Sequence, residues 1–84
     1  MDVNEIRQRI ERGIPDSRVE VVGEEAHYSA LIVSPAFEGK TRIEQHQMVY
    51  ALLRDEMASQ AVHALALRTM TADEWNRERD TQEG

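Results

Sequence analysis

The spacing of apolar residues is the feature that most limits how this chain of 84 residues can fold. It alternates between the three- to four-residue period of an amphipathic helix and the dense, β-branched runs of buried strands. Helical spacing predicts helices over residues 2–12, 41–59 and 71–80, and the denser runs predict strands over 18–22, 27–33 and 62–69. The predicted order is α-β-β-α-β-α, an α+β domain with a three-stranded mixed sheet, helices packed on it and a single core.

Turn and capping residues support these boundaries. Gly23-Glu24-Glu25 separates the first two predicted strands, which predicts a β-hairpin. Thr41 with Glu44, and Thr71 with Glu74, have the spacing of a capping box at the start of a helix. We therefore expect a compact domain over residues 1–79 and a mobile C-terminal tail over residues 80–84.

Amino-acid composition limits the ligands and activities that we expect of this chain. The chain has no cysteine, so any metal would need histidine or carboxylate ligands, or ligands from a partner. A net charge of −6 opposes binding to a polyanion. There is no apolar run of roughly 18–20 residues and no signal-peptide pattern, so we expect a cytoplasmic protein without membrane contact. The sequence also lacks a recognisable nucleophile motif, nucleotide-binding glycines and paired carboxylates, so we do not expect an enzyme.

Topology makes two of the three histidines interesting. If the second and third strands are parallel neighbours, His27 and His63 open them at the same end of the sheet, on strands about 4.8 Å apart. Two imidazoles at this separation could share one metal ion. Residue type alone leaves other interpretations open: a hydrogen-bonded structural histidine or an acid–base group at His63, and an exposed loop residue at His27. His46 lies between Ile43 and Tyr50, in the apolar stripe of the predicted long helix, where packing or partner contact is expected instead of ligation.

Several ordered motifs resemble those of BolA proteins. They are Val33–Lys40, His46–Tyr50, Val62–Leu65 and Thr71–Trp75, together with Gly23–Tyr28, which resembles the short hairpin loop of the IbaG-type branch. The resemblance covers nearly the whole chain. It implies a fold similar to the type II KH domain and a non-enzymatic role beside monothiol glutaredoxins in iron–sulfur cluster assembly, trafficking or iron sensing.

The resemblance also implies a ligand set. A 2Fe-2S cluster would be shared with the glutaredoxin and glutathione, and no cofactor is expected in the isolated protein. The family's C-terminal ligand histidine falls on His63, and the loop ligand, a His or Cys in different members, falls on His27. For partner binding we predict contacts from the segment Phe37, Glu38, Gly39 and Lys40 and from His46.

A BolA-type DNA-binding transcriptional regulator is the second hypothesis. The KH-like fold and the family's association with transcription and stress response both allow it. The GxxG clamp of KH domains is missing, however, because Gly39 stands alone in its loop. Family members often have basic residues around positions 45 and 47, whereas this chain has the uncharged Gln45 and Gln47 there, which weakens a nucleic-acid role. The acidic balance of the chain also opposes such a role. We therefore expect nucleic-acid binding to be weak.

Overall fold

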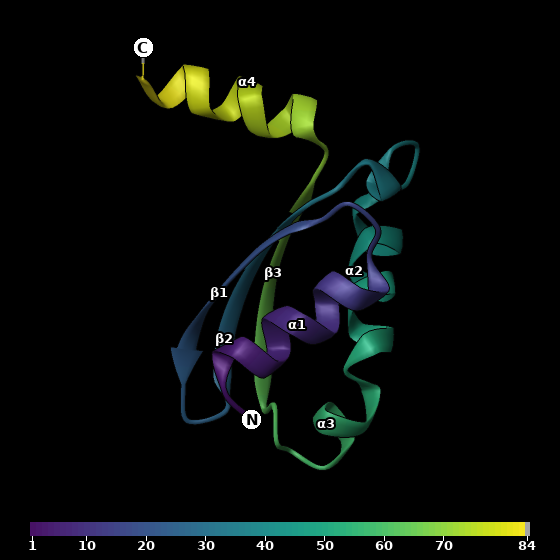
Figure 1. The fold of residues 1–84 in the computed structure, drawn as a ribbon, viewed down its shortest axis with the longest axis vertical. Coiled ribbons are helices and arrows are strands. Elements are labelled where there is room, and N and C mark those ends of the chain that lie inside the picture. Colours follow the sequence, from purple (N-terminus) through teal and green to yellow (C-terminus); the bar gives the residue numbers. More distant parts are fainter. Residues whose placement is uncertain (84) are drawn as a thin grey trace.

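The computed structural model describes the backbone of residues 1–83 and the side chains of residues 1–79 (Figure 1). In chain order the elements are α1 (Val3–Gly13), β1 (Arg18–Glu24), β2 (His27–Val33), the short 3-10 helix η1 (Pro35–Phe37), α2 (Arg42–Leu52), α3 (Arg54–Ala58), β3 (Ala64–Met70) and α4 (Ala72–Glu83). The predicted α-β-β-α-β-α order is confirmed, with η1 added and the long central helix divided in two.

The sheet has the strand order β1-β2-β3. β1 and β2 are antiparallel, and Glu24 pairs with His27 where the hairpin closes. β2 and β3 are parallel, and His27 pairs with Ala64. The predicted three-stranded mixed sheet is therefore confirmed, and the first residues of β2 and β3 lie at the same end of it.

The core lies on one face of this sheet. α1 packs against β1 and against α2, and α2 packs against β3 (Figure 1). The least exposed apolar residues come from the helices, the sheet and the connecting loops: Ile6, Ile10, Ile14, Ile32, Phe37, Val49, Leu53 and Val62. Burying each such side chain contributes about 1.5–3 kcal/mol. Glu20, Ser29 and Ala66 on the opposite face are exposed, so one face of the sheet supplies the core.

The predicted continuous helix over residues 41–59 is wrong at Leu53. This residue has φ −120° and ψ 20°, outside helical geometry, and separates α2 from α3. Its side chain is completely buried, so packing against the core takes precedence over continuous helical spacing. Ile43, expected in the apolar stripe, is 70% exposed, and α2 instead buries Gln45 and Val49, one turn apart.

Gln45 is a buried polar residue whose side chain closes the loop before α2. Its Nε2 donates hydrogen bonds to the carbonyl oxygens of Phe37 (3.2 Å) and Lys40 (3.1 Å). Its Oε1 accepts a hydrogen bond of 2.6 Å from the hydroxyl of Thr69 in β3. Because these polar groups are satisfied inside the protein, a glutamine is tolerated at this core position.

Both predicted capping boxes are present. The Thr41 amide donates to Glu44 Oε1 at 2.8 Å and the Glu44 amide donates to Thr41 Oγ1 at 3.2 Å. The same exchange joins Thr71 and Glu74, at 2.9 Å and 3.3 Å. The hydrogen bond from the threonine amide is the main reason why the pKa of each glutamate carboxyl lies below its ordinary value.

α4 projects from the end of the sheet instead of lying flat on it (Figure 1). Two contacts tie its first turns to the strands: the Arg18 guanidinium lies 5.9 Å from the centre of the Trp75 ring, and Arg68 pairs with Glu78. Trp75 therefore links α4 to the sheet. No helix in the described part of the chain is long and apolar enough to span a membrane.

The predicted boundary at residue 79 falls inside a helix. α4 continues to Glu83, beyond the residue at which the sequence pattern ended the domain. The remaining residue of the predicted tail, at position 84, lies outside the described residues. Mobility of residues 80–84 stays a prediction.

Candidate functional site

Two histidines lie side by side at the hairpin end of the sheet. His27 is the first residue of β2, and His63 immediately precedes β3, which begins at Ala64. The centres of their rings are 5.1 Å apart and the ring planes are inclined by 58°. Both residues are exposed. The structure thus brings together the two predicted ligands, with His63 one residue before the strand that it was expected to open.

Backbone hydrogen bonds hold the two histidine-bearing segments together. The Ala26 carbonyl oxygen accepts from the amides of both His63 (2.8 Å) and Ala64 (3.0 Å). Glu25 and Ala26 form the hairpin turn with φ of 53° and 68°, the left-handed pair that matches the twist of a two-residue hairpin. This conformation costs non-glycine residues about 1–2 kcal/mol each. The link to β3 helps to hold this turn, and with it the position of His27.

Gly23 is required by the close approach of the two hairpin strands. Its φ is +129°, and a Cβ atom built on it would lie 2.2 Å from the carbonyl oxygen of His27. Any side chain there would have to move the backbone of His27 itself. The sequence pattern places Gly23 only in the turn, because the contact depends on strand pairing across the hairpin.

The ring nitrogens of both histidines have defined roles. His27 Nδ1 lies 3.0 Å from the carbonyl oxygen of Glu25, and His63 Nδ1 lies 2.6 Å from Oε1 of Gln60. These oxygens can only accept, so both Nδ1 atoms carry the proton, and in the neutral rings the lone pair is on Nε2. Metal-ligating histidines commonly donate their other ring N–H to such an acceptor. In each neutral ring, Nε2 is therefore the nitrogen whose lone pair can bind a metal ion.

The donor set of this chain is incomplete for a metal. Across the described residues, no group of three or more His, Cys, Asp or Glu side chains is placed to hold a metal ion. The histidine pair can supply two imidazole ligands, and the chain contains no cysteine to add sulfur. Further ligands would have to come from another molecule, which the exposure of both rings permits.

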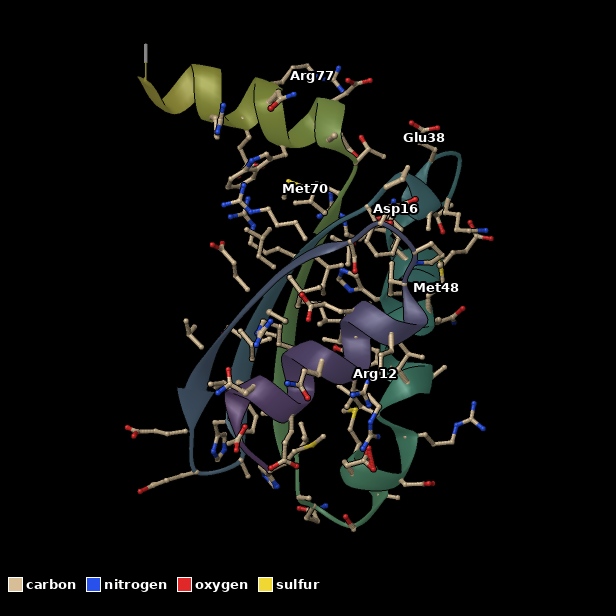
Figure 2. All side chains as sticks on the ribbon, viewed as in Figure 1. Arg12, Asp16, Glu38, Met48, Met70 and Arg77 are labelled. Atoms are coloured by element: carbon tan, nitrogen blue, oxygen red, sulfur yellow. The ribbon has the colours of Figure 1, made fainter. Side chains whose placement is uncertain are left out.

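The predicted partner-binding segment lies at the other end of the sheet. Glu38, Gly39 and Lys40 are exposed and follow η1, so the seven-residue strand β2, about 20 Å long, separates them from the histidine pair. Figure 2 shows Glu38 at the same end of the molecule as Met70. Phe37 is 1% exposed and belongs to the core, so its side chain is not available for the predicted partner contact. Contacts from the three exposed residues stay a prediction.

His46 is separate from the histidine pair, on α2. Its half-buried ring stands edge-on to the ring of Tyr50, with 6.5 Å between centres. Its Nε2 is buried and, within the described part of the protein, has no hydrogen-bond partner. The Tyr50 hydroxyl donates to the Leu65 carbonyl oxygen at 3.0 Å, which links α2 to β3. This environment fits the packing role, and partner contact stays a prediction.

Comparison with known proteins identifies the family. The family model described as BolA-like protein matches residues 7–74, and the chain belongs to the BolA family. It is 30% identical over 79 residues to the acid stress protein IbaG of Escherichia coli K12, covering 94% of each chain. This likeness confirms the IbaG-like resemblance drawn from the sequence motifs.

Two further comparisons bear on fold and function. The chain is 42% identical over 59 residues to the DNA-binding transcriptional regulator BolA of Escherichia coli K12, covering 70% of this chain and 55% of that protein. A solved structure of a BolA homologue from Coxiella burnetii superimposes with a TM-score of 0.80 at 39% identity, covering 90% of this chain and 97% of that one. The fold is therefore BolA-like.

Proposed function

We propose that this chain is a non-enzymatic, cytoplasmic partner of a monothiol glutaredoxin and co-ligates a 2Fe-2S cluster through Nε2 of His63 and His27. Its role is in iron–sulfur cluster assembly, trafficking or iron sensing. The observation that supports this proposal best is the exposed pair of imidazoles, 5.1 Å apart. Each Nδ1 donates to an oxygen, which leaves each Nε2 free to ligate.

The available ligands fit a shared cluster. Imidazole is a suitable ligand for iron, and in Rieske centres two histidines replace two cysteines on one iron. The chain has no cysteine, so the sulfur ligands would come from glutaredoxin and glutathione. When bound, the cluster would supply one-electron redox chemistry. Residues of this chain orient the two imidazoles: the Glu25 carbonyl oxygen accepts from His27 Nδ1, and the Gln60 side chain accepts from His63 Nδ1.

Reconstitution tests the proposal. The purified protein is mixed with a monothiol glutaredoxin, glutathione, iron and sulfide, and visible absorption and circular dichroism spectra are recorded. We expect a spectrum distinct from that of the glutaredoxin homodimer. Glu20→Gln is the control, because Glu20 is exposed on the open face of the sheet and lies outside the pair, and it should give the wild-type spectrum. A mixture that shows only the homodimer spectrum would contradict the proposal.

DNA binding is the second candidate function, favoured by the name of the 42% identical relative. The net charge of −6 opposes it, because binding to phosphates depends on clustered Lys and Arg. We expect binding to duplex DNA to be non-specific at physiological salt, with a Kd no tighter than about 10⁻⁶ M. A salt-resistant, sequence-selective complex in a gel-shift titration would favour the regulator instead.

A further inference from the structure

We infer that Gln60 is a positioning residue that selects the ring tautomer of His63. The inference deepens the proposed function, in which His63 ligates the cluster, but the tautomer itself is a property of the free protein. Gln60 Oε1 lies 2.6 Å from His63 Nδ1 and accepts a hydrogen bond from it. A neutral imidazole carries its proton on either nitrogen, and the hydrogen bond made by one nitrogen decides which state is present. Gln60 therefore places the lone pair on Nε2.

The loop between α3 and β3 gives this side chain a fixed origin. The Gln60 amide donates to the Met57 carbonyl oxygen at 3.3 Å, and the Val62 amide donates to the Glu56 carbonyl oxygen at 3.0 Å. Val62 is 1% exposed and anchors the loop in the core. The loop therefore presents the side-chain amide of Gln60 to His63, and the backbone of the loop is held on both sides of Gln60.

The backbone conformation at Gln60 is unfavourable for its residue type. Its φ is +69°, the left-handed region that glycine adopts freely and asparagine tolerates. A glutamine there costs about 1–2 kcal/mol of backbone energy. Glycine would lower that cost but has no side-chain oxygen to accept the hydrogen bond from His63 Nδ1. The side chain of Gln60 is thus explained by its effect on His63 and not by the local backbone.

Glycine suits the backbone conformation at residue 60 but cannot accept a hydrogen bond from His63. Substitution of Gln60 should therefore change the stability of the fold and the tautomer of His63 in different directions. Gln60→Gly relieves the backbone and removes the acceptor, so the melting temperature should be unchanged or higher while His63 loses its tautomer preference. Gln60→Asn keeps an amide and tolerates the left-handed region, but it is one methylene shorter and should also fail to hold His63. A purely structural role for Gln60 predicts the reverse, a loss of stability with no change in tautomer.

The tautomer is measured in the free protein by long-range ¹H–¹⁵N NMR of the histidine rings. We expect the Nδ1–H form at both His27 and His63 in the wild type. In Gln60→Gly, His63 should shift toward the Nε2–H form, while His27, held by a backbone carbonyl, should not change. Asp16→Gly is the matched control: Asp16 is exposed, also has a positive φ of 52°, and lies at the other end of the molecule (Figure 2). It should leave both rings unchanged.

The second measurement is cluster binding with glutaredoxin. Loss of an outer partner of a metal-ligating histidine typically costs 10- to 100-fold in affinity, and we expect a weakening of about this size in Gln60→Gly. An Nε2–H ring at His63 in the wild type would overturn the inference. So would a Gln60→Gly variant that keeps the Nδ1–H form, or one that changes tautomer but binds cluster as the wild type does. If the tautomer shifts and no mixed cluster forms even with wild-type protein, Gln60 orients His63 and the proposed function fails.

Discussion

His27 and His63 form one site, yet the molecule holds them by different means. His27 depends on the hairpin: its Nδ1 donates to a main-chain carbonyl, and its position depends on Gly23 and the left-handed turn. His63 depends on a loop anchored by Val62, and its Nδ1 donates to the side chain of Gln60. The orientation of His63 can therefore be changed by a side-chain substitution, whereas that of His27 changes only with the backbone.

Gly23→Ala should have the largest effect, because it breaks the backbone support of His27. The added Cβ would meet the His27 carbonyl oxygen at 2.2 Å in a conformation that favours glycine. We expect a loss of about 2–4 kcal/mol in the free energy of unfolding, measured by urea denaturation.

Gly39→Ala is the control for this substitution. Gly39 also has a positive φ, +74°, but a Cβ there would meet no atom within 4 Å. Only the backbone cost applies, so we expect a loss of about 1 kcal/mol. Equal losses in the two variants would show that the contact with His27 is unimportant.

The next largest effect separates the two histidines directly. His63→Ala should abolish the mixed-cluster spectrum with glutaredoxin and leave the helix content unchanged, because His63 is exposed and outside the core. His27→Ala should weaken the cluster less, because Glu24 pairs with residue 27 across the hairpin and its carboxylate or a water could replace the imidazole. Visible circular dichroism checks both variants. If His63→Ala binds the cluster with an unaltered spectrum and an unaltered stability of the complex, His63 is not a ligand and has a structural role.

His27→Cys sharpens the comparison with a smaller change. A thiolate is a softer ligand for iron than an imidazole, so the variant should bind cluster with a shifted visible spectrum. The backbone of the hairpin should keep its place, because residue 27 is exposed and its main-chain pairing with β1 and β3 does not depend on the side chain. A His27→Cys spectrum identical to that of His27→Ala would show that position 27 does not contact the cluster.

The smallest effect is expected far from the site, at the capping boxes. The pKa of Glu44 is lowered in the folded protein, mainly by the hydrogen bond from the Thr41 amide. A lowered pKa stabilises the fold at pH values above the ordinary value of 4.5, and this contribution is lost as the pH falls through the folded-state value. Glu44→Gln should therefore make the urea midpoint slightly less dependent on pH between 7 and 3. The reconstituted cluster at neutral pH should not change, since Glu44 lies on α2.

The element order and the two capping boxes could be predicted from the sequence, because helical spacing, strand runs and Thr-x-x-Glu signals act between residues close in the chain. The proximity of His27 and His63 was also predictable. It follows from strand order and from the parallel direction of strands joined by a helix, and neither needs the packing in detail.

Only the tertiary structure decided which side chains serve the core and which serve the site. The break at Leu53, the exposure of Ile43 and the burial of Phe37 depend on contacts between segments far apart in sequence. The acceptor of His63 depends on a left-handed residue, Gln60, for which the sequence contains no glycine or asparagine signal. Local patterns determine the order of the elements, but the break in the long helix and the partner of each polar atom depend on how those elements pack in three dimensions.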